Sequence, residues 1–291
     1  IIPTCVFGNY SSGKSTFINA LIGKELLPSG GDTVTAKIYE IKRSPSDDFS
    51  RIRFTYHNEP MELRFDSGRF RVAQGDQDSD ILAELILMIS DYSKNEMIEA
   101  VSKALEFLND CEKDNADKNG IGNVICVEIP FSPNGILGQS RNQFVIFDTP
   151  GSNSASNIDH SMVLEEALQG FSNGIPVWVS QYETVDSEDN ALLCDKVLNI
   201  KALDNRFNMI VFNKADGSEL PENGFSEKQE KKILEYCSVE KMYSAGIFFV
   251  SSILGLGVKT DGFLRNNQYR KIYRKEKESY CDPEDEDYTT L

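Results

Sequence analysis

Positively charged residues and long apolar runs are scarce in this chain of 291 residues. It has 30 lysines and arginines against 46 aspartates and glutamates, which gives a formal net charge of −16. Such an acidic chain repels nucleic acid unless basic residues are locally segregated, so we expect no nucleic-acid partner. No apolar run approaches the ~20 residues needed to cross a bilayer, and no signal peptide is visible. These absences argue against a membrane-spanning or secreted protein.

Cysteine is sparse and dispersed. The six cysteines form no close pair and match no zinc-site spacing. Scattered thiols are typical of a reducing compartment, so we expect a cytoplasmic protein. The chain begins directly on an apolar run and ends near the acidic residues 282–287, and we therefore expect it to be part of a longer protein.

Residues 8–16 form the strongest motif of the chain, Gly-x-x-x-x-Gly-Lys-Ser. A β-branched and aromatic run at 1–7 precedes it, and apolar residues at helical spacing follow at 15–22. Strand, loop and helix are the context that a phosphate-binding loop requires. We expect every residue of the loop to contact a nucleotide: Gly8, Asn9, Tyr10, Ser11, Ser12, Gly13, Lys14, Ser15 and Thr16.

The residue types of this loop fit phosphate chemistry. Gly8 and Gly13 allow a tight turn in which backbone N–H groups and a helix N-terminus converge on phosphates. Lys14 would reach the β- and γ-phosphates, and Ser15 would offer its hydroxyl to Mg²⁺. The alternative is a Gly/Ser-rich turn with a chance lysine.

Two further positions are candidates for the metal and the γ-phosphate. Asp148 ends an apolar strand and can hold Mg²⁺ through water, while the N–H of Gly151 can sense the γ-phosphate. Thr35, at the entry to a predicted strand, is preferred over Thr33 as the threonine that closes over Mg²⁺. The predicted metal set is therefore Ser15, Thr35 and Asp148. Taken alone, a threonine before a strand is unremarkable, and Asp-x-x-Gly is an ordinary turn.

The run from Asn213 to Asp216, after the strand-like residues 207–212, selects the base. Asp216 can accept hydrogen bonds from both N–H donors on the guanine edge, and adenine offers neither donor there. Lys214 would lie along the ring, and Asn213 would tie this loop to the phosphate loop. Ser251 and Ser252, after a last predicted strand, are weaker candidates for contact with the guanine carbonyl. We therefore expect GTP and GDP as ligands.

Four motifs at strand ends, in this order, predict an α/β fold of the P-loop NTPase class. We expect a doubly wound, mostly parallel sheet with helices on both faces. Residues 1–260 would form the GTPase domain, with a helical insertion at 66–120 whose apolar stripes pack in the core. Residues 261–291 form a charged segment leading out of the domain. Its basic helix is expected to pack on the core, with a membrane or nucleic-acid contact as the alternative.

Residues 8–23, 26–30 and 33–36 resemble the GTPase domain of the dynamin family, and bacterial dynamin-like proteins look closest. The resemblance extends over roughly residues 1–257. It implies Mg²⁺-dependent hydrolysis of GTP, a nucleotide-driven homodimer of GTPase heads, and membrane remodelling by regions outside this chain. A switch-type GTPase that recruits a protein or ribosomal partner is the alternative.

The glutamine that orients water in Ras-type GTPases is missing, because Ser152 follows Gly151. The resemblance implies that Ser11 and a monovalent cation, K⁺ or Na⁺, replace it when two heads pair. Ser11, Lys14, Thr35 and Gly151 are therefore the predicted catalytic residues. The loops at 216–224 and 181–189 are candidates for partner contact, and each could equally be a plain solvated loop.

Overall fold

The computed structural model describes most of the chain. The described residues are 1–28, 37–66, 68–75, 79–93, 96–114, 120–150, 174–185, 187–200, 203, 209–217, 226–228, 231, 235 and 246–280. All structural statements below concern these residues.

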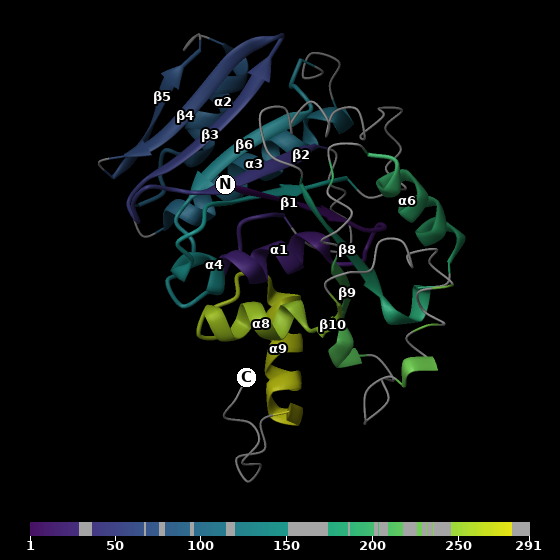
Figure 1. The fold of residues 1–291 in the computed structure, drawn as a ribbon. Coiled ribbons are helices and arrows are strands. Elements are labelled where there is room, and N and C mark those ends of the chain that lie inside the picture. Colours follow the sequence, from purple (N-terminus) through teal and green to yellow (C-terminus); the bar gives the residue numbers. More distant parts are fainter. Residues whose placement is uncertain are drawn as a thin grey trace.

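A ten-stranded sheet organises the chain, in the strand order β10-β9-β8-β1-β7-β2-β6-β3-β4-β5 (Figure 1). The first five strands in that order run parallel to one another. They are β10 (Ile247–Val250), β9 (Met209–Asn213), β8 (Ile175–Gln181), β1 (Ile2–Phe7) and β7 (Phe144–Asp148). Because parallel strands place their carboxyl ends at one edge, the motifs that follow β1, β7 and β9 meet there.

The other half of the sheet is largely antiparallel. β2 (Ile38–Arg43) lies antiparallel to β7 and parallel to β6 (Val124–Ile129). Three strands continue the sheet: β3 (Ser50–Tyr56), β4 (Glu59–Asp66) and β5 (Arg69–Gln74). His57 and Asn58 connect β3 to β4 with positive φ at both residues, as a tight hairpin turn of type I′ requires. The sequence pattern did not predict β5, which falls in the segment expected to be helical.

Helices cover both faces of the sheet, as predicted. α1 (Lys14–Ile22), α2 (Asp80–Ile89) and α3 (Met97–Asp114) share one core cluster with Val6 of β1. Cys5 and Phe7 point to the opposite face, where α6 (Glu188–Leu198) contributes Leu193 to a second cluster. The predicted apolar stripes of α2 and α3 are confirmed as core, since their residues are buried: Ile81, Leu82, Leu85, Val101, Leu105 and Leu108. Among the described helices, none is both long and apolar enough to span a membrane.

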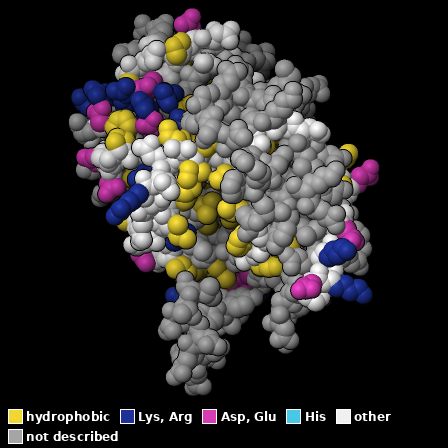
Figure 2. Space-filling view, in the orientation of Figure 1, with side chains coloured by type: hydrophobic (Ala, Val, Ile, Leu, Met, Phe, Trp, Pro, Cys, Tyr) yellow, Lys and Arg dark blue, Asp and Glu magenta, His cyan; other side chains and the backbone are white. Residues whose placement is uncertain are grey.

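The outer face of β3, β4 and β5 is charged. Arg51, Arg64 and Arg71 are direct cross-strand neighbours. Each pairs with an acid: Glu128, Glu62 and Asp66 respectively. Figure 2 shows basic side chains mixed with acidic ones over these strands. The arginines of these pairs are accessible to solvent, whereas Glu62 is buried beside Arg64.

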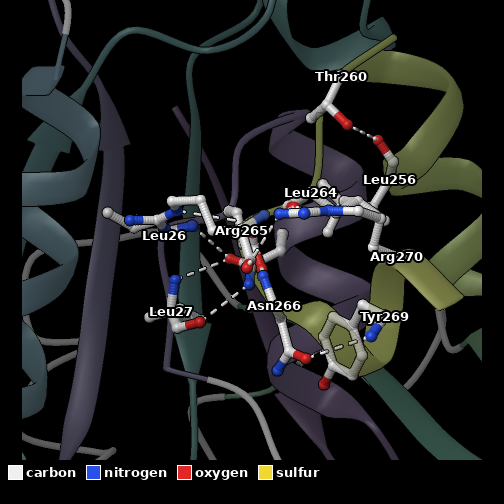
Figure 3. Close-up of polar contacts among 11 residues, drawn as sticks. Leu26, Leu27, Leu256, Thr260, Leu264, Arg265, Asn266, Tyr269 and Arg270 are labelled. Atoms are coloured by element: carbon white, nitrogen blue, oxygen red, sulfur yellow. Dashed lines mark hydrogen bonds and ion pairs between the residues drawn. The ribbon is translucent and has the colours of Figure 1, made fainter. Parts of the chain in front are cut away.

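The C-terminal helices attach to α1. α8 (Ser252–Lys259) packs along α1, and α9 (Asn267–Tyr280) packs on α8 through the buried ring of Tyr273. The carboxylate of Glu25 accepts hydrogen bonds from the N–H groups of Arg265 and Asn266, at 2.6 and 3.1 Å. Figure 3 shows Arg265 and Asn266, which precede α9, and Tyr269 of its first turn near the Leu26–Leu27 segment. The predicted packing of the basic last helix on the core is confirmed.

Candidate nucleotide site

The phosphate loop lies between β1 and α1, at the carboxyl edge of the parallel strands. Gly13 has φ 85°, a left-handed conformation that suits glycine, and a Cβ there would collide with the side-chain amide of Asn213. A Cβ on Gly8 would collide with the carbonyl oxygen of Val179 in β8. Both glycines of the motif are therefore required by close approaches of neighbouring strands to the loop.

Lys14, the first residue of α1, folds back over the loop. Its Nζ donates to the carbonyl oxygens of Gly8 and Asn9, at 2.9 and 3.2 Å. The side chain is 7% exposed. Burial lowers the pKa of Lys14, and the charge of Asp148 opposes this effect. The ammonium is thus held at the loop, where the phosphates of a nucleotide would supply the negative charge that it lacks.

Ser11 and Ser12 form the crown of the loop. Ser11 is exposed and has φ 60°, a left-handed conformation that costs a non-glycine residue roughly 1–2 kcal/mol. The Oγ of Ser12 is buried and has no hydrogen-bond partner among the described residues. Buried hydroxyls are normally satisfied, so this atom fits a role as a donor to a phosphate oxygen.

Ser15 and Asp148 form the candidate magnesium site. The hydroxyl of Ser15 donates to Oδ2 of Asp148 at 3.0 Å, which joins α1 to the end of β7. Oδ1 of Asp148 is buried and has no partner in the described part of the chain. No cluster of three His, Cys, Asp or Glu side chains occurs among the described residues. A hydroxyl, a single carboxylate, phosphate oxygens and water are the ligands that suit Mg²⁺, so these residues fit the ion.

Asp148→Asn is expected to stabilise the nucleotide-free protein near neutral pH. Burial raises the pKa of Asp148 to about 6, although Lys14 and the Ser15 hydrogen bond oppose the shift. The ionised carboxylate therefore destabilises the fold above that pH, on the order of 1–3 kcal/mol, and the neutral amide removes this penalty. The gain should shrink as the pH falls through about 6, because the carboxylate of the parent protein then becomes protonated.

Urea unfolding without Mg²⁺, at about pH 7.5 and about pH 4.5, measures this difference. Asp47→Asn, in an exposed loop, is the matched control and should change neither value. A variant Asp148→Asn that is no more stable than the parent at the higher pH would contradict the argument.

Asn213, at the end of β9, joins the base motif to the phosphate loop. Its Nδ2 donates to the carbonyl oxygens of Ser12 and Gly13, at 3.1 and 3.3 Å. Its Oδ1 accepts from the backbone N–H and the hydroxyl of Ser252, at 3.2 and 2.6 Å. The predicted tie between Asn213 and the phosphate loop is confirmed, and the bonds to Ser252 add a link to the segment after β10 that was not predicted.

Lys214, Asp216 and Ser251 lie close to this junction. Lys214 has φ 61°, and Asp216 follows it in the short helix η4 (Ala215–Gly217). Partial burial lowers the pKa of Lys214, while the charges of Asp216 and Glu183 oppose this effect. Ser251 caps α8 by accepting from the N–H of Leu254 at 3.3 Å, so its hydroxyl has a structural role. The order of elements places Asp216 and Ser252 near the same strand edge.

Three predicted site residues, Thr35, Gly151 and Thr16, are not shown to face the nucleotide site. Thr35 and Gly151 lie outside the described residues, and their roles stay predictions. The hydroxyl of Thr16 lies 3.0 Å from the hydroxyl of Tyr269 in α9. Contact between Thr16 and a nucleotide is therefore left to its backbone N–H, which in the first turn of a helix has no intrahelical partner.

Two residues that the sequence did not single out hold the crown of the loop. Nε2 of Gln181, at the end of β8, donates to the carbonyl oxygen of Ser11 at 2.7 Å. Nδ2 of Asn9 donates to Oδ1 of Asn190 in α6 at 2.6 Å. Asn190 is fully buried and donates in turn to the Ser180 hydroxyl and to the Thr184 carbonyl. Gln181 begins the stretch that the sequence predicted as a loop, so no signal pointed to its bond with Ser11, and none distinguished Asn190.

Comparison with known proteins identifies the family of the chain. A family model described as the dynamin family matches residues 4–215, which is most of the chain. A bacterial dynamin-like protein from Nostoc punctiforme is 36% identical over 66 residues, 23% of this chain and 9% of that protein. The matched segment is thus a small part of that relative.

Two solved structures are also similar to the chain. An oligomerised bacterial dynamin pair, described in the sensing and tethering of membranes, is 15% identical with a TM-score of 0.48. The match covers 96% of this chain and 48% of the other. Toc33 from Arabidopsis thaliana, solved with GDP and Mg²⁺, is 11% identical with a TM-score of 0.41 over 85% of this chain and 70% of the other. The chain spans about half the length of the bacterial dynamin.

Proposed function

This chain belongs to the dynamin family of GTPases, and we propose that it hydrolyses GTP when two copies pair across their nucleotides. The observation that carries the GTP site is the amide of Asn213. It bonds to both the phosphate loop and Ser252, which supports a single site in which the motif at 213–216 would read guanine and the loop would bind phosphate.

Different residues of the site would contact the phosphates, the Mg²⁺ ion and the guanine base. Lys14 and the N–H groups of the loop and of the first turn of α1 would hold the phosphates. Ser15 and Asp148 would hold Mg²⁺, which neutralises charge between the β- and γ-phosphates when bound. Thr35 would complete the metal site and Gly151 would contact the γ-phosphate. Asp216 would read the guanine edge.

The attacking water needs a group to orient it, because Ser152 stands where Ras-type GTPases have glutamine. We assign this task to Ser11 together with a K⁺ or Na⁺ ion, completed by pairing of the heads. The support is the exposed, left-handed position of Ser11 at the crown of the loop. Tyr10 beside it is 42% exposed, so an aromatic ring is available next to the crown for contact with a second copy.

The cellular role extends the family assignment. We propose a cytoplasmic chain whose parent protein acts on membranes through regions outside these residues. The dispersed cysteines support the compartment. The family assignment supports a role of the parent protein at membranes. Nucleotide-driven pairing would be the contribution of this domain to that role.

Ser11→Ala is expected to abolish the rise of GTPase activity with protein concentration and to leave GTP affinity nearly unchanged. The lost hydroxyl would act mainly in the transition state, after the pair has formed. The measurement is specific activity against protein concentration, in potassium and in a large organic cation. Ser90→Ala, an exposed serine at the end of α2, is the control.

Mass measurement with GDP and fluoride tests the pair directly. A dimer in this transition-state mimic supports the proposal. A monomer whose turnover depends on neither concentration nor cation would contradict pairing, and would favour a GTP switch completed by another protein.

A further inference from the structure

We propose that Gln181 is a positioning residue for GTP hydrolysis, which holds the crown of the phosphate loop in its active shape. The inference rests on the proposed function of the same site. Gln181 would act through Ser11 and Ser12 without touching the nucleotide.

Gln181 and Asn213 both hold the phosphate loop by hydrogen bonds to its backbone carbonyls. The two residues end neighbouring strands, β8 and β9, and are directly paired in register. Gln181 donates to the carbonyl of Ser11, and Asn213 donates to the carbonyls of Ser12 and Gly13. Three successive carbonyls of the loop are therefore held by two adjacent side-chain amides.

The bond from Gln181 fixes the direction of a catalytically placed peptide. The carbonyl of Ser11 and the N–H of Ser12 belong to one planar trans peptide, so they point in opposite directions. With the carbonyl held against Gln181, the N–H of Ser12 points into the loop, 3.3 Å from the carbonyl oxygen of Asn9. Loss of the bond would leave this peptide held only through the Ser12 N–H, and would weaken the restraint on the strained left-handed conformation of Ser11.

A second contact, between Asn9 and Asn190, also holds the phosphate loop, so a change at Gln181 can have a specific effect. Asn190 holds Asn9 on the other side of the crown, so the loop as a whole stays attached to α6 when Gln181 is changed. Lys14 and Asn213 keep their own bonds to the loop. Loss of the Gln181 bond should therefore affect the orientation of Ser11 and Ser12 more than the capture of phosphate.

The segment after Gln181 also reaches the base motif. The short helix η3 (Tyr182–Thr184) places Glu183 where its charge acts on Lys214. The carbonyl of Thr184 accepts from Asn190 at 2.6 Å. Gln181 thus begins a turn that is bonded to α6, and its own side chain connects this turn to Ser11.

Gln181→Leu tests the inference, because leucine keeps bulk but cannot donate. We expect the single-turnover rate at saturating GTP to fall about 10-fold, while the GTP dissociation constant changes less than about 3-fold. The melting temperature should stay close to that of the parent protein. Gln139→Leu is the matched control, since Nε2 of Gln139 in α4 (Ile136–Gln139) also donates to a backbone carbonyl, that of Pro133 at 3.0 Å.

A double-mutant cycle with Ser11→Gly shows whether Gln181 acts through Ser11. Glycine adopts the left-handed conformation without strain and lacks the hydroxyl, so Gln181→Leu should add little to the defect of Ser11→Gly. A parent-like rate in Gln181→Leu, an equal loss of affinity and rate, or full additivity in the cycle would each overturn the inference while leaving the GTPase proposal intact. Absence of turnover in the parent protein would overturn the proposed function, and this inference with it.

Discussion

Lys14→Met is expected to weaken the binding of both GTP and GDP by about 100-fold or more. Hydrogen bonds to charged groups are each worth roughly 1.5–3 kcal/mol, and the ammonium would make more than one to the phosphates. Its position is already set without nucleotide, because Nζ is bonded to the carbonyls of Gly8 and Asn9. Methionine keeps the length of the stem and removes the charge, so the loss should come from the phosphates and not from packing.

Lys259→Met is a close control for Lys14→Met. Lys259 also donates to a backbone carbonyl near α1, that of Ala20 at 2.7 Å, and burial also lowers its pKa. It lies at the other end of α1 from the phosphate loop, so its loss should lower stability without changing nucleotide affinity. Titration of each variant with a fluorescent guanine nucleotide, with melting temperatures measured in parallel, gives the comparison. Parent-like affinity in a folded Lys14→Met variant would remove Lys14 from the site.

Local residue patterns predicted most of the fold. β1, the glycine-rich loop and α1 were predicted together, because a strand pattern, two glycines and a helical pattern follow in close succession. The apolar spacing at 15–22 matches the observed helix, which ends at Ile22 and is capped by Gly23 with φ 68°. The predicted contact between Asn213 and the phosphate loop is confirmed across 201 residues of sequence, because each motif marks the end of its own strand.

Two strands, β8 and β5, were not predicted from the sequence, for physical reasons. β8 carries Pro176 near its start, and a proline usually argues against a central strand. β5 lies at the edge of the sheet and is mostly exposed, so burial gives it a weak pattern. Because β8 was missed, its last residue, Gln181, was assigned to a loop.

The contacts of Gln181 and Asn190 could not be deduced from spacing. Gln181 is 170 residues from Ser11, and their bond depends on the register between β8, β9 and β1. A shift of one residue would turn Gln181 to the other face of the sheet. Side-chain clamps of this kind follow from tertiary packing and not from a local motif.

Asp216→Asn is expected to exchange the base preference of the site from guanine to xanthine. The carboxylate of Asp216 would accept from N1–H and from the 2-amino group of guanine. An amide presents a donor to that amino group and leaves it without an acceptor, so GTP affinity should fall by ~10³-fold or more. The same amide N–H₂ can donate to the 2-carbonyl of xanthine, and xanthosine triphosphate should therefore bind better to the variant than to the parent.

Competition between GTP and xanthosine triphosphate for the parent and the variant measures this exchange. Glu183→Gln is the control, since Glu183 is the other carboxylate whose charge acts on Lys214. Its loss should leave the preference for guanine intact, because reading the base requires an acceptor at the guanine edge and not a charge near Lys214. Retention of GTP affinity in Asp216→Asn would show that another group reads the base. A loss of both nucleotides would show instead that the change disturbs η4 and the position of Lys214, since only a role in base recognition predicts loss of one nucleotide together with gain of the other.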